Sequence, residues 1–198
     1  MCRHIGYIGR KKNLYSILLK HNHSLIELAY KPKLMSEAKL NADGFGLAWK
    51  HNKGFKLYKN YLPVWNDMNL KDISKSISSN LVIANVRSAT TTENQGYYNT
   101  HPFSLNSFCF SHNGYIKDFN FITRKKILNY LSPKYINLIK GQTDSEFIFV
   151  LLMQFIETSN NIEKSIKGVI QIIKENFTAC MLNFLIATFD KKGKRLLF

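Results

Sequence analysis

The first half of the chain carries short apolar blocks separated by polar residues, a pattern typical of β-strands. Five blocks, mostly rich in β-branched or aromatic residues, predict strands: Cys2–Ile8, Phe45–Trp49, Phe55–Tyr58, Leu81–Val86 and Ser107–Phe110. Asn52, Lys53 and Gly54 lie between the second and third blocks, so these two blocks predict a hairpin in which the glycine supplies the turn.

Helical periodicity dominates the second half. Three ranges predict helices: Phe119–Leu131, Asp144–Ile156 and Ile162–Ile173. The range 144–156 is apolar almost all round, as expected of a helix that packs between two layers. Earlier in the chain, Asp67 is predicted to cap a short helix with Leu70, Ile73 and Ile77 on one face.

The end of the chain returns to the strand pattern. Ala179–Thr188 predicts a strand that is apolar on both faces, Lys191–Lys194 predicts a turn, and Arg195–Phe198 predicts the beginning of another strand. Strands, then helices, then strands again favour a layered α+β architecture over an alternating parallel sheet. No repeat or flexible linker interrupts the sequence, so we expect a single domain over residues 1–198.

Composition adds a strong positive charge to this picture. The chain is 45% hydrophobic, enough for a sizeable core, and its formal net charge is +15. Such an excess raises nucleic acid as a partner, but the basic residues are spread out, most of them are lysines, and no recognition motif accompanies them. We therefore expect neither a nucleic-acid partner nor a membrane partner.

Compartment and metal content follow from what the sequence shows. The longest strongly apolar stretches are about half of what a membrane-spanning helix needs, and the beginning of the chain carries no readable secretory signal. Three scattered cysteines form neither a disulfide framework nor a CxxC pair, so a cytoplasmic location is expected. His21 and His23 have no accompanying ligand cluster, and no metal site is predicted.

Cys2 is the first candidate for chemistry. Removal of the initiator methionine from such a chain leaves a thiol and a free α-amine on one residue. An α-amine titrates at about 7.7–8.0, so it can accept the thiol proton near neutral pH without a histidine partner. Considered alone, however, a free cysteine is more often a small buried hydrophobic residue.

The segments around Cys2 and further along the chain form an ordered set of motifs. They are MCRHIGYIG (1–9), NADGFGLAW (41–49), ANVRSATT (84–91), NTHPF (99–103), FSHNGYI (110–116) and GQTDSE (141–146). From Met1 to about Phe184 the chain resembles the glutaminase domain of class II glutamine amidotransferases, which are N-terminal nucleophile hydrolases. It is most similar to the small stand-alone branch that includes the γ-glutamyl hydrolase of the ergothioneine pathway.

The resemblance implies roles for the catalytic residues. Cys2 is the nucleophile that attacks the γ-carbonyl of glutamine or a γ-glutamyl amide and forms a γ-glutamyl thioester. Asn113 offers a side-chain donor and Gly114 a backbone N–H to the oxyanion. The alternative for Asn113 and Gly114 is an ordinary hairpin turn, since Asn-Gly between apolar runs is a common turn signal.

The resemblance also implies the substrate-binding residues. Arg87 holds the α-carboxylate, and its planar fork suits a bidentate contact. Asp144 holds the α-ammonium, although Thr143–Glu146 also looks like an ordinary helix start that Asp144 caps. Thr100 and His101 lie near the substrate.

Other residues of the motifs receive structural roles. Gly44, Phe45 and Gly46 match a family turn that shapes the pocket wall. His4 and His112 flank the proposed catalytic residues, and packing or hydrogen bonding is a better expectation for them than acid catalysis.

For the whole chain, the resemblance implies the four-layer αββα sandwich of N-terminal nucleophile hydrolases, or a version of it without its C-terminal strands. The expected function is an amidohydrolase that releases glutamate from a small γ-glutamyl substrate, with no cofactor. The alternative is a silent or partner-dependent subunit that binds a γ-glutamyl ligand or supplies ammonia to a separate synthase. An unpaired apolar edge at the end of the chain predicts a homo-oligomer or a second subunit.

Overall fold

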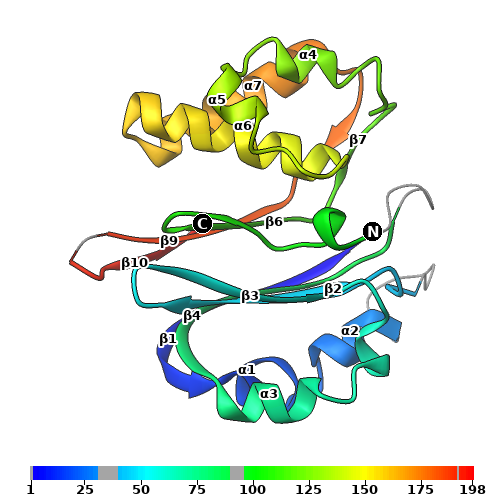
Figure 1. Ribbon diagram of the computed structural model, residues 1–198, viewed down its shortest axis with the longest axis vertical. Helices are drawn as coiled ribbons and strands as arrows, with labels where there is room; N and C mark the ends of the chain where they lie inside the picture. Colours follow the sequence, from blue (N-terminus) through cyan, green and yellow to red (C-terminus); the bar gives the residue numbers. More distant parts are fainter. Residues whose placement is uncertain (1, 31–39, 90–95, 191) are drawn as a thin grey trace. The chain divides into compact units, whose positions relative to one another are not determined.

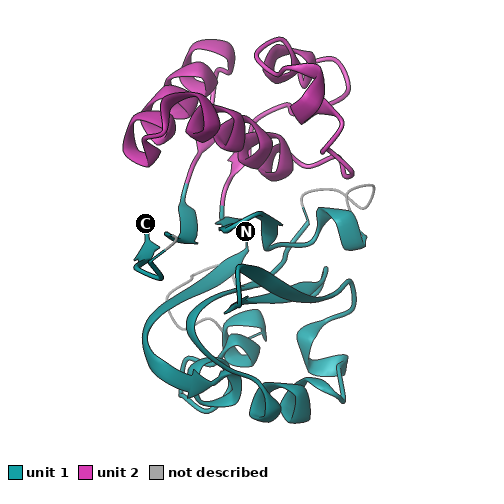
Figure 2. Cartoon of the chain, turned by 60° about the vertical axis from the view of Figure 1, so that its left-hand side comes forward, with its two compact units in different colours: residues 1–113, 183–198 teal, residues 114–182 magenta. Residues whose placement is uncertain are grey.

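The computed structural model describes residues 2–30, 40–89, 96–190 and 192–198. The chain forms two compact units (Figure 2). Unit 1 contains residues 1–113 and 183–198, and unit 2 contains residues 114–182. Each unit is described by itself, and the single domain expected over residues 1–198 stays a prediction.

Unit 1 is built on an antiparallel sheet of four strands, called sheet A here. Its strands, in spatial order, are β1 (Arg3–Asn13), β4 (Ser78–Val86), β2 (Phe45–His51) and β3 (Gly54–Asn60). Alternate residues of a strand point to opposite faces, and the burial pattern follows this period. Val82 and Ala84 belong to a core on one face, whereas Leu81 and Ile83 belong to a different core on the other.

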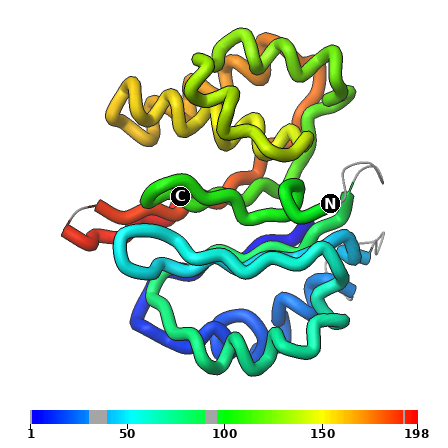
Figure 3. The backbone as a smooth tube through the Cα atoms, in the orientation of Figure 1, coloured from blue at the N-terminus to red at the C-terminus, as the bar shows by residue number. Residues whose placement is uncertain are grey.

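Three short helices cover the first of these faces (Figures 1 and 3). They are α1 (Leu14–Leu18), α2 (Leu25–Tyr30) and α3 (Leu70–Ser76), with the 3-10 turn η1 (Val64–Asn66) before the last. Leu14, Leu18 and Leu25 are fully buried against the sheet. Asn13 caps α1, since its side chain accepts a hydrogen bond of 2.9 Å from the Ser16 N–H.

A second antiparallel sheet, called sheet B here, packs on the other face of sheet A. Its strands, in spatial order, are β10 (Arg195–Leu197), β9 (Phe184–Phe189), β6 (Phe108–His112) and β5 (Phe103–Leu105), and the turn η3 (Tyr97–Asn99) precedes β5. The inter-sheet core joins Ala48, Leu81 and Ile83 of sheet A to Cys109 and Ala187 of sheet B. Unit 1 therefore has a helical layer followed by two stacked sheets.

Unit 2 is mainly helical. Its elements are the paired strands β7 (Tyr115–Ile116) and β8 (Cys180–Met181), and the helices α4 (Lys125–Leu128), α5 (Pro133–Ile136), α6 (Asp144–Ser159) and α7 (Ile162–Asn176). Asn160 ends α6 in a left-handed conformation with φ 49°, and the Asn161 side chain caps α7 by accepting from the Lys164 N–H. The long helices expected from residues 144 and 162 are thus confirmed.

Four local expectations are wrong. The helix predicted over residues 119–131 is only the single turn α4, because Asn120 and Thr123 bind each other and the neighbouring backbone and hold a tight turn instead. The strand predicted over 179–188 is divided into β8 and β9, which pair with different partners.

The third and the fourth concern the ends of elements in unit 1. Asn52, with φ 51°, supplies the left-handed turn of the β2–β3 hairpin, and Gly54 already belongs to β3. The N-cap of α3 is Asn69 and not Asp67. The Asp67 carboxylate instead accepts hydrogen bonds from the Tyr58 hydroxyl and the Asn60 side-chain amide. The strand predicted at 195–198 is confirmed as β10, while Lys191 of the predicted turn lies outside the described residues. No helix within the described ranges is long and apolar enough to cross a membrane.

Candidate active site

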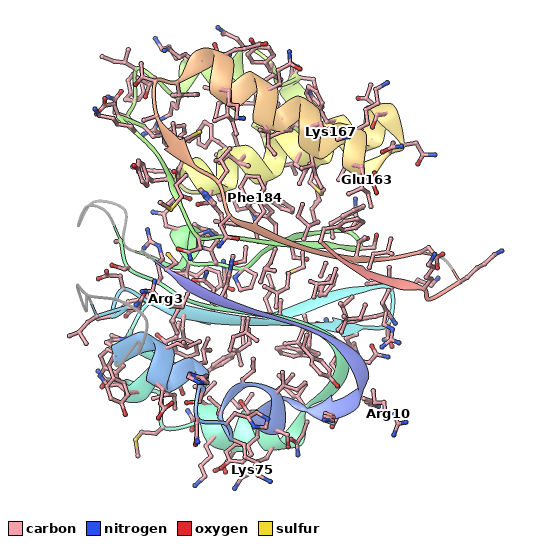
Figure 4. All side chains as sticks on the ribbon, turned by 180° about the vertical axis from the view of Figure 1, so that it is seen from behind. Arg3, Arg10, Lys75, Glu163, Lys167 and Phe184 are labelled. Atoms are coloured by element: carbon pink, nitrogen blue, oxygen red, sulfur yellow. The ribbon has the colours of Figure 1, made fainter. Side chains whose placement is uncertain are left out.

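The space between the two sheets of unit 1 changes from apolar to polar along the strands. On β4, Leu81 and Ile83 belong to the inter-sheet core, and Asn85 follows on the same face. On β6, Ser111 follows Cys109 in the same way. Figure 4 labels Arg3, which begins β1 at this polar end, and Arg10, which lies toward the other end of the strand.

Cys2 lies at the polar end, one residue before β1. The antiparallel register pairs Arg3 with Val86, and the same register carried one step further sets Cys2 opposite Arg87. The Cys2 side chain is buried, at 8% exposure, and its Sγ lies 3.9 Å from the Ser88 carbonyl oxygen. The proposed nucleophile and the proposed carboxylate-binding arginine are thus neighbours across two strands.

Arg87 is held by a close turn of the 41–46 segment. Its backbone N–H donates to the Gly44 carbonyl at 2.8 Å, and its carbonyl accepts from the Asp43 N–H at 3.1 Å. The Asp43 carboxylate accepts a further bond of 2.7 Å from the Ala89 N–H. Gly44 has φ 112°, and a Cβ there would also come within 3.0 Å of the Thr100 hydroxyl, so only glycine fits this position without strain.

Thr100 and His101 lie on the segment between η3 and β5. Thr100 is fully buried, its hydroxyl donates to the Gly96 carbonyl at 2.9 Å, and its carbonyl accepts from the Lys59 ammonium at 2.9 Å. The His101 carbonyl lies directly over Gly46, where any Cβ would overlap it. Gly44, directly before β2, and Gly46, within β2, are therefore both required by the packing of this segment.

At this end of unit 1, both ring nitrogens of the buried His101 and Oδ1 of the half-buried Asn113 are withdrawn from solvent and have no hydrogen-bond partner among the described residues. Buried polar atoms are nearly always paired, so unpaired ones gathered at one place mark a surface that a polar ligand can complete.

Two cations, Arg87 and Lys59, act on His101 at this end of unit 1. Burial lowers the pKa of His101 well below its usual range, and interactions with His112, Arg87, Lys59 and His4 lower it further. His101 is therefore neutral near pH 7, with one ring nitrogen as a donor and the other as an acceptor. Such a site favours a ligand that carries negative charge.

His4 and His112 are packed, as expected from the sequence. Burial, with a smaller effect from His112, lowers the pKa of His4 to about 4. Its Nδ1 lies 3.4 Å from the Ser111 hydroxyl. His112 is 1% exposed and packs edge-on against Phe184, at 5.2 Å between ring centroids.

Asn113 directly follows β6, and its backbone N–H donates to the Asn183 carbonyl at 2.9 Å. The hairpin alternative for Asn113 and Gly114 is wrong, because β6 pairs with β5 and β9, whereas β7 pairs with β8. The division between the two units falls between these two residues. The Asn-Gly step therefore carries the chain out of sheet B and does not join two paired strands.

Asp144 belongs to unit 2, where it is the first residue of α6. One carboxylate oxygen accepts from the Ile116 N–H and the other from the Ser145 N–H, both at 2.7 Å. The capping role suggested for Asp144 belongs to Thr143, whose hydroxyl accepts from the Glu146 N–H. The Asp144 carboxylate thus holds the backbone at Ile116, two residues after Gly114.

Sequence reasoning missed three residues at this site: Asn85, Ser111 and Lys59. A signal was available for the first two, since each is a polar residue at an inward position of an otherwise apolar strand. For Lys59, one of many lysines on the chain, no such signal exists. Within the described ranges no group of three or more histidine, cysteine or acidic side chains could hold a metal ion.

The fold and this site define a class of protein, and comparison with known sequences agrees. Residues 23–192 match the sequence profile of the class-II glutamine amidotransferases. The match covers most of the chain, so the chain belongs to the class-II glutamine amidotransferase family.

Two relatives illustrate the family. The chain is 36% identical over 166 residues to the probable glutamine amidotransferase DUG3 of Saccharomyces cerevisiae, covering 79% of this chain and 46% of that protein. It is 29% identical over 117 residues to the gamma-glutamyl-hercynylcysteine sulfoxide hydrolase of Mycolicibacterium smegmatis, covering 59% of this chain and 52% of that protein. The chain spans about half the length of these relatives.

Solved structures show the fold. A class-II glutamine aminotransferase domain protein from Silicibacter pomeroyi superposes with a TM-score of 0.60 at 20% identity, covering 96% of this chain and 78% of that one. The allosteric regulatory enzyme of purine biosynthesis gives a TM-score of 0.59 at 17% identity, covering 94% of this chain and 35% of that one. The expected fold class, an α+β fold of the N-terminal nucleophile hydrolase type, is confirmed.

Proposed function

We propose that this chain hydrolyses the γ-amide of glutamine or of another γ-glutamyl compound, with Cys2 as the nucleophile. One observation carries the proposal. Cys2 is buried and its register sets it opposite Arg87, at the end of unit 1 where His101 and Asn113 have buried polar atoms without partners in the described chain. In a member of the class-II glutamine amidotransferase family, this arrangement suits a small γ-glutamyl substrate that carries an α-carboxylate.

The proposed reaction has two steps. The Cys2 thiol gives its proton to its own α-amine, and the sulfur attacks the γ-carbonyl carbon. The Asn113 side-chain amide and the Gly114 N–H stabilise the oxyanion until the C–N bond breaks and the amine leaves with a proton. Water then attacks the γ-glutamyl thioester, and glutamate and the free thiol are released.

Recognition of the γ-glutamyl group is proposed for four residues. Arg87 takes the α-carboxylate, and neutral His101 can donate to the same anionic group, with Thr100 holding the backbone beside it. Asp144 takes the α-ammonium, as the family resemblance implies. The charges of Arg87 and Lys59 favour the α-carboxylate end of the substrate.

The direct test measures glutamate released from glutamine and a panel of γ-glutamyl amides. We expect release by the mature protein, confirmed by N-terminal mass to have lost Met1, and almost none by Cys2→Ala. Cys109→Ala is the matched control, since Cys109 is buried in the inter-sheet core and burial raises the pKa of its thiol. Undiminished activity of Cys2→Ala would rule out the mechanism.

We also infer the protein's setting. Cys2, Cys109 and Cys180 form no disulfide with one another, which suits the reducing cytoplasm, and the location can be checked by fractionation. A partner subunit or a second copy of the chain is a further proposal. If the chain alone binds the ligand without cleaving it, and a co-purifying protein restores the cleavage, the partner-dependent form is favoured over independent hydrolysis.

A further inference from the structure

A buried hydrogen-bonded group of three residues connects the two sheets of unit 1. We call it the inter-sheet triad: His4 on β1, Asn85 on β4 and Ser111 on β6. The Asn85 Nδ2 donates to the Ser111 Oγ at 2.9 Å, and the His4 Nδ1 lies 3.4 Å from the same oxygen. Asn85 and Ser111 are fully buried, and His4 pairs directly with Asn85 across the ladder.

Each member of the triad lies two residues from a residue of the candidate site. His4 lies two residues after Cys2. Asn85 lies two residues before Arg87, and Ser111 two residues before Asn113. The side chains of an extended chain point to the same face at every second residue. The ladder bonds made by the Arg87 and Asn113 N–H groups continue this extended geometry past the strand ends.

The triad also marks the boundary of the apolar core. Ile83 and Cys109 lie two residues further from the site, on β4 and β6, and pack with Ala48 and Ala187. Apolar packing between the sheets has no direction of its own, whereas hydrogen bonds require a specific distance and angle. The hydrogen bonds of the triad can therefore set the spacing and register of the two sheets next to the site.

The direction of the bonds follows from the chemistry of the groups. Asn85 uses an amide N–H toward Ser111, which leaves the serine hydroxyl hydrogen available for His4 Nδ1. His4 can accept it because burial keeps its ring neutral near pH 7. The Ser111 hydroxyl of sheet B thus accepts from Asn85 and donates to His4, which both belong to sheet A.

We propose that the inter-sheet triad is a positioning device for the reaction, on the premise that the proposed function is correct. It holds Cys2, Arg87 and Asn113 in a fixed mutual arrangement although they come from three strands and two sheets. His4, Asn85 and Ser111 are positioning residues: they act through the backbone and not by contact with the substrate. Their loss affects the chemical step more than substrate binding.

The test compares Ser111→Ala with Cys109→Ala, which truncates the neighbouring inward position of the same strand. We expect Ser111→Ala to lower kcat about 10- to 100-fold with KM nearly unchanged, because small misplacements of reacting groups have effects of this size. Cys109→Ala should lower thermal stability and leave kcat close to the wild-type value. Ser111→Cys, similar in shape but a weak hydrogen-bonding group, serves if the alanine variant does not fold.

A double-mutant comparison tests the connection itself. If Asn85 and Ser111 act through their mutual bond, Asn85→Ala combined with Ser111→Ala should lower kcat no more than the more damaging single variant. Unchanged kcat in Ser111→Ala, a loss confined to KM, or a loss equal to that of Cys109→Ala would overturn the proposal.

A readout without turnover separates this proposal from the proposed function. The rate of Cys2 alkylation by iodoacetamide, followed by peptide mass spectrometry, is expected to change in Ser111→Ala and not in Cys109→Ala. If no γ-glutamyl amide is cleaved by the wild-type protein, the proposed function fails. The triad proposal fails separately if Cys2 reacts at the same rate in the wild-type, Ser111→Ala and Cys109→Ala proteins.

Discussion

At the scale of single residues, unit 1 contains two histidines, His4 and His101, that stay neutral near pH 7. Burial lowers the pKa of both rings, with a smaller effect of His112 on His4 and of His112, Arg87, Lys59 and His4 on His101. A neutral imidazole can accept a hydrogen bond, as His4 does from Ser111 in the proposed triad. The unfolded chain exposes the same rings to water, where they titrate near pH 6.5.

This difference predicts a pH dependence of stability. Between about pH 6.5 and pH 4 the unfolded state binds a proton at His4 that the folded state does not, so the free energy of unfolding falls as the pH falls. One such proton gives a slope of about 1.4 kcal/mol per pH unit at its steepest. Urea unfolding from pH 7 to pH 5 measures it. His4→Gln should show a shallower slope than the wild type, and an equal slope would contradict the assignment.

At the scale of elements, the beginning of α6 organises unit 2. The Asp144 carboxylate binds the Ile116 N–H of β7 and the Ser145 N–H in its own first turn. An acidic group in the first turn also suits the positive end of the helix dipole. Glu146 similarly accepts from the Lys140 and Gly141 N–H groups, so two carboxylates tie the helix to the segments beside it.

Substitution of Asp144 should separate its structural role from the proposed substrate role. We expect Asp144→Ala to lower the free energy of unfolding by about 1.5–3 kcal/mol, the usual contribution of a hydrogen bond to a charged group. Hydrogen exchange of the Ile116 amide should become faster. Asp144→Asn keeps an acceptor oxygen, so it should retain most of the protection while raising the KM for glutamine. Unchanged exchange in the alanine variant would exclude the structural role.

At the scale of the whole molecule, the edge strand β10 connects the two sheets of unit 1. The Arg195 guanidinium binds the carbonyls of Gly9 at 2.5 Å and Asn80 at 3.1 Å, which joins sheet B to two strands of sheet A. Phe198 exchanges both backbone bonds with Ile186 of β9. The last residues are thus part of the sandwich and its cross-sheet connections.

Removal of the Arg195 side chain should weaken the fold of unit 1. We expect Arg195→Ala to lower the free energy of unfolding by about 2 kcal/mol, because two backbone carbonyls lose a charged donor. Lys194→Ala, at an exposed neighbouring position, is the control and should change little. Chemical unfolding of both variants measures the difference, and equal stability would show that the bonds contribute nothing net.

Much of the architecture could be predicted from local pattern. Strands over Leu81–Val86 and Phe108–Phe110 were readable because apolar, β-branched and aromatic residues have strong local preferences, and the helices from Asp144 and Ile162 have clear periodicity. The shortening of the predicted 119–131 helix to the single turn α4 could not be predicted, because the side chains of Asn120 and Thr123 compete with the helix for backbone groups. The interruption between β8 and β9 depends on pairing with distant strands, which local pattern does not contain.

The sequence by itself determined the class of fold, the family and the identity of the candidate catalytic residues, since these depend on residue type and order along the chain. Only the tertiary structure decided that the register sets Cys2 opposite Arg87, that Gly46 lies under the His101 carbonyl, and that Asn85 and Ser111 bind each other between the sheets. Those contacts join strands separated by many residues. Strand register and sheet stacking, which create them, are set by the packing of the whole core and not by any local segment.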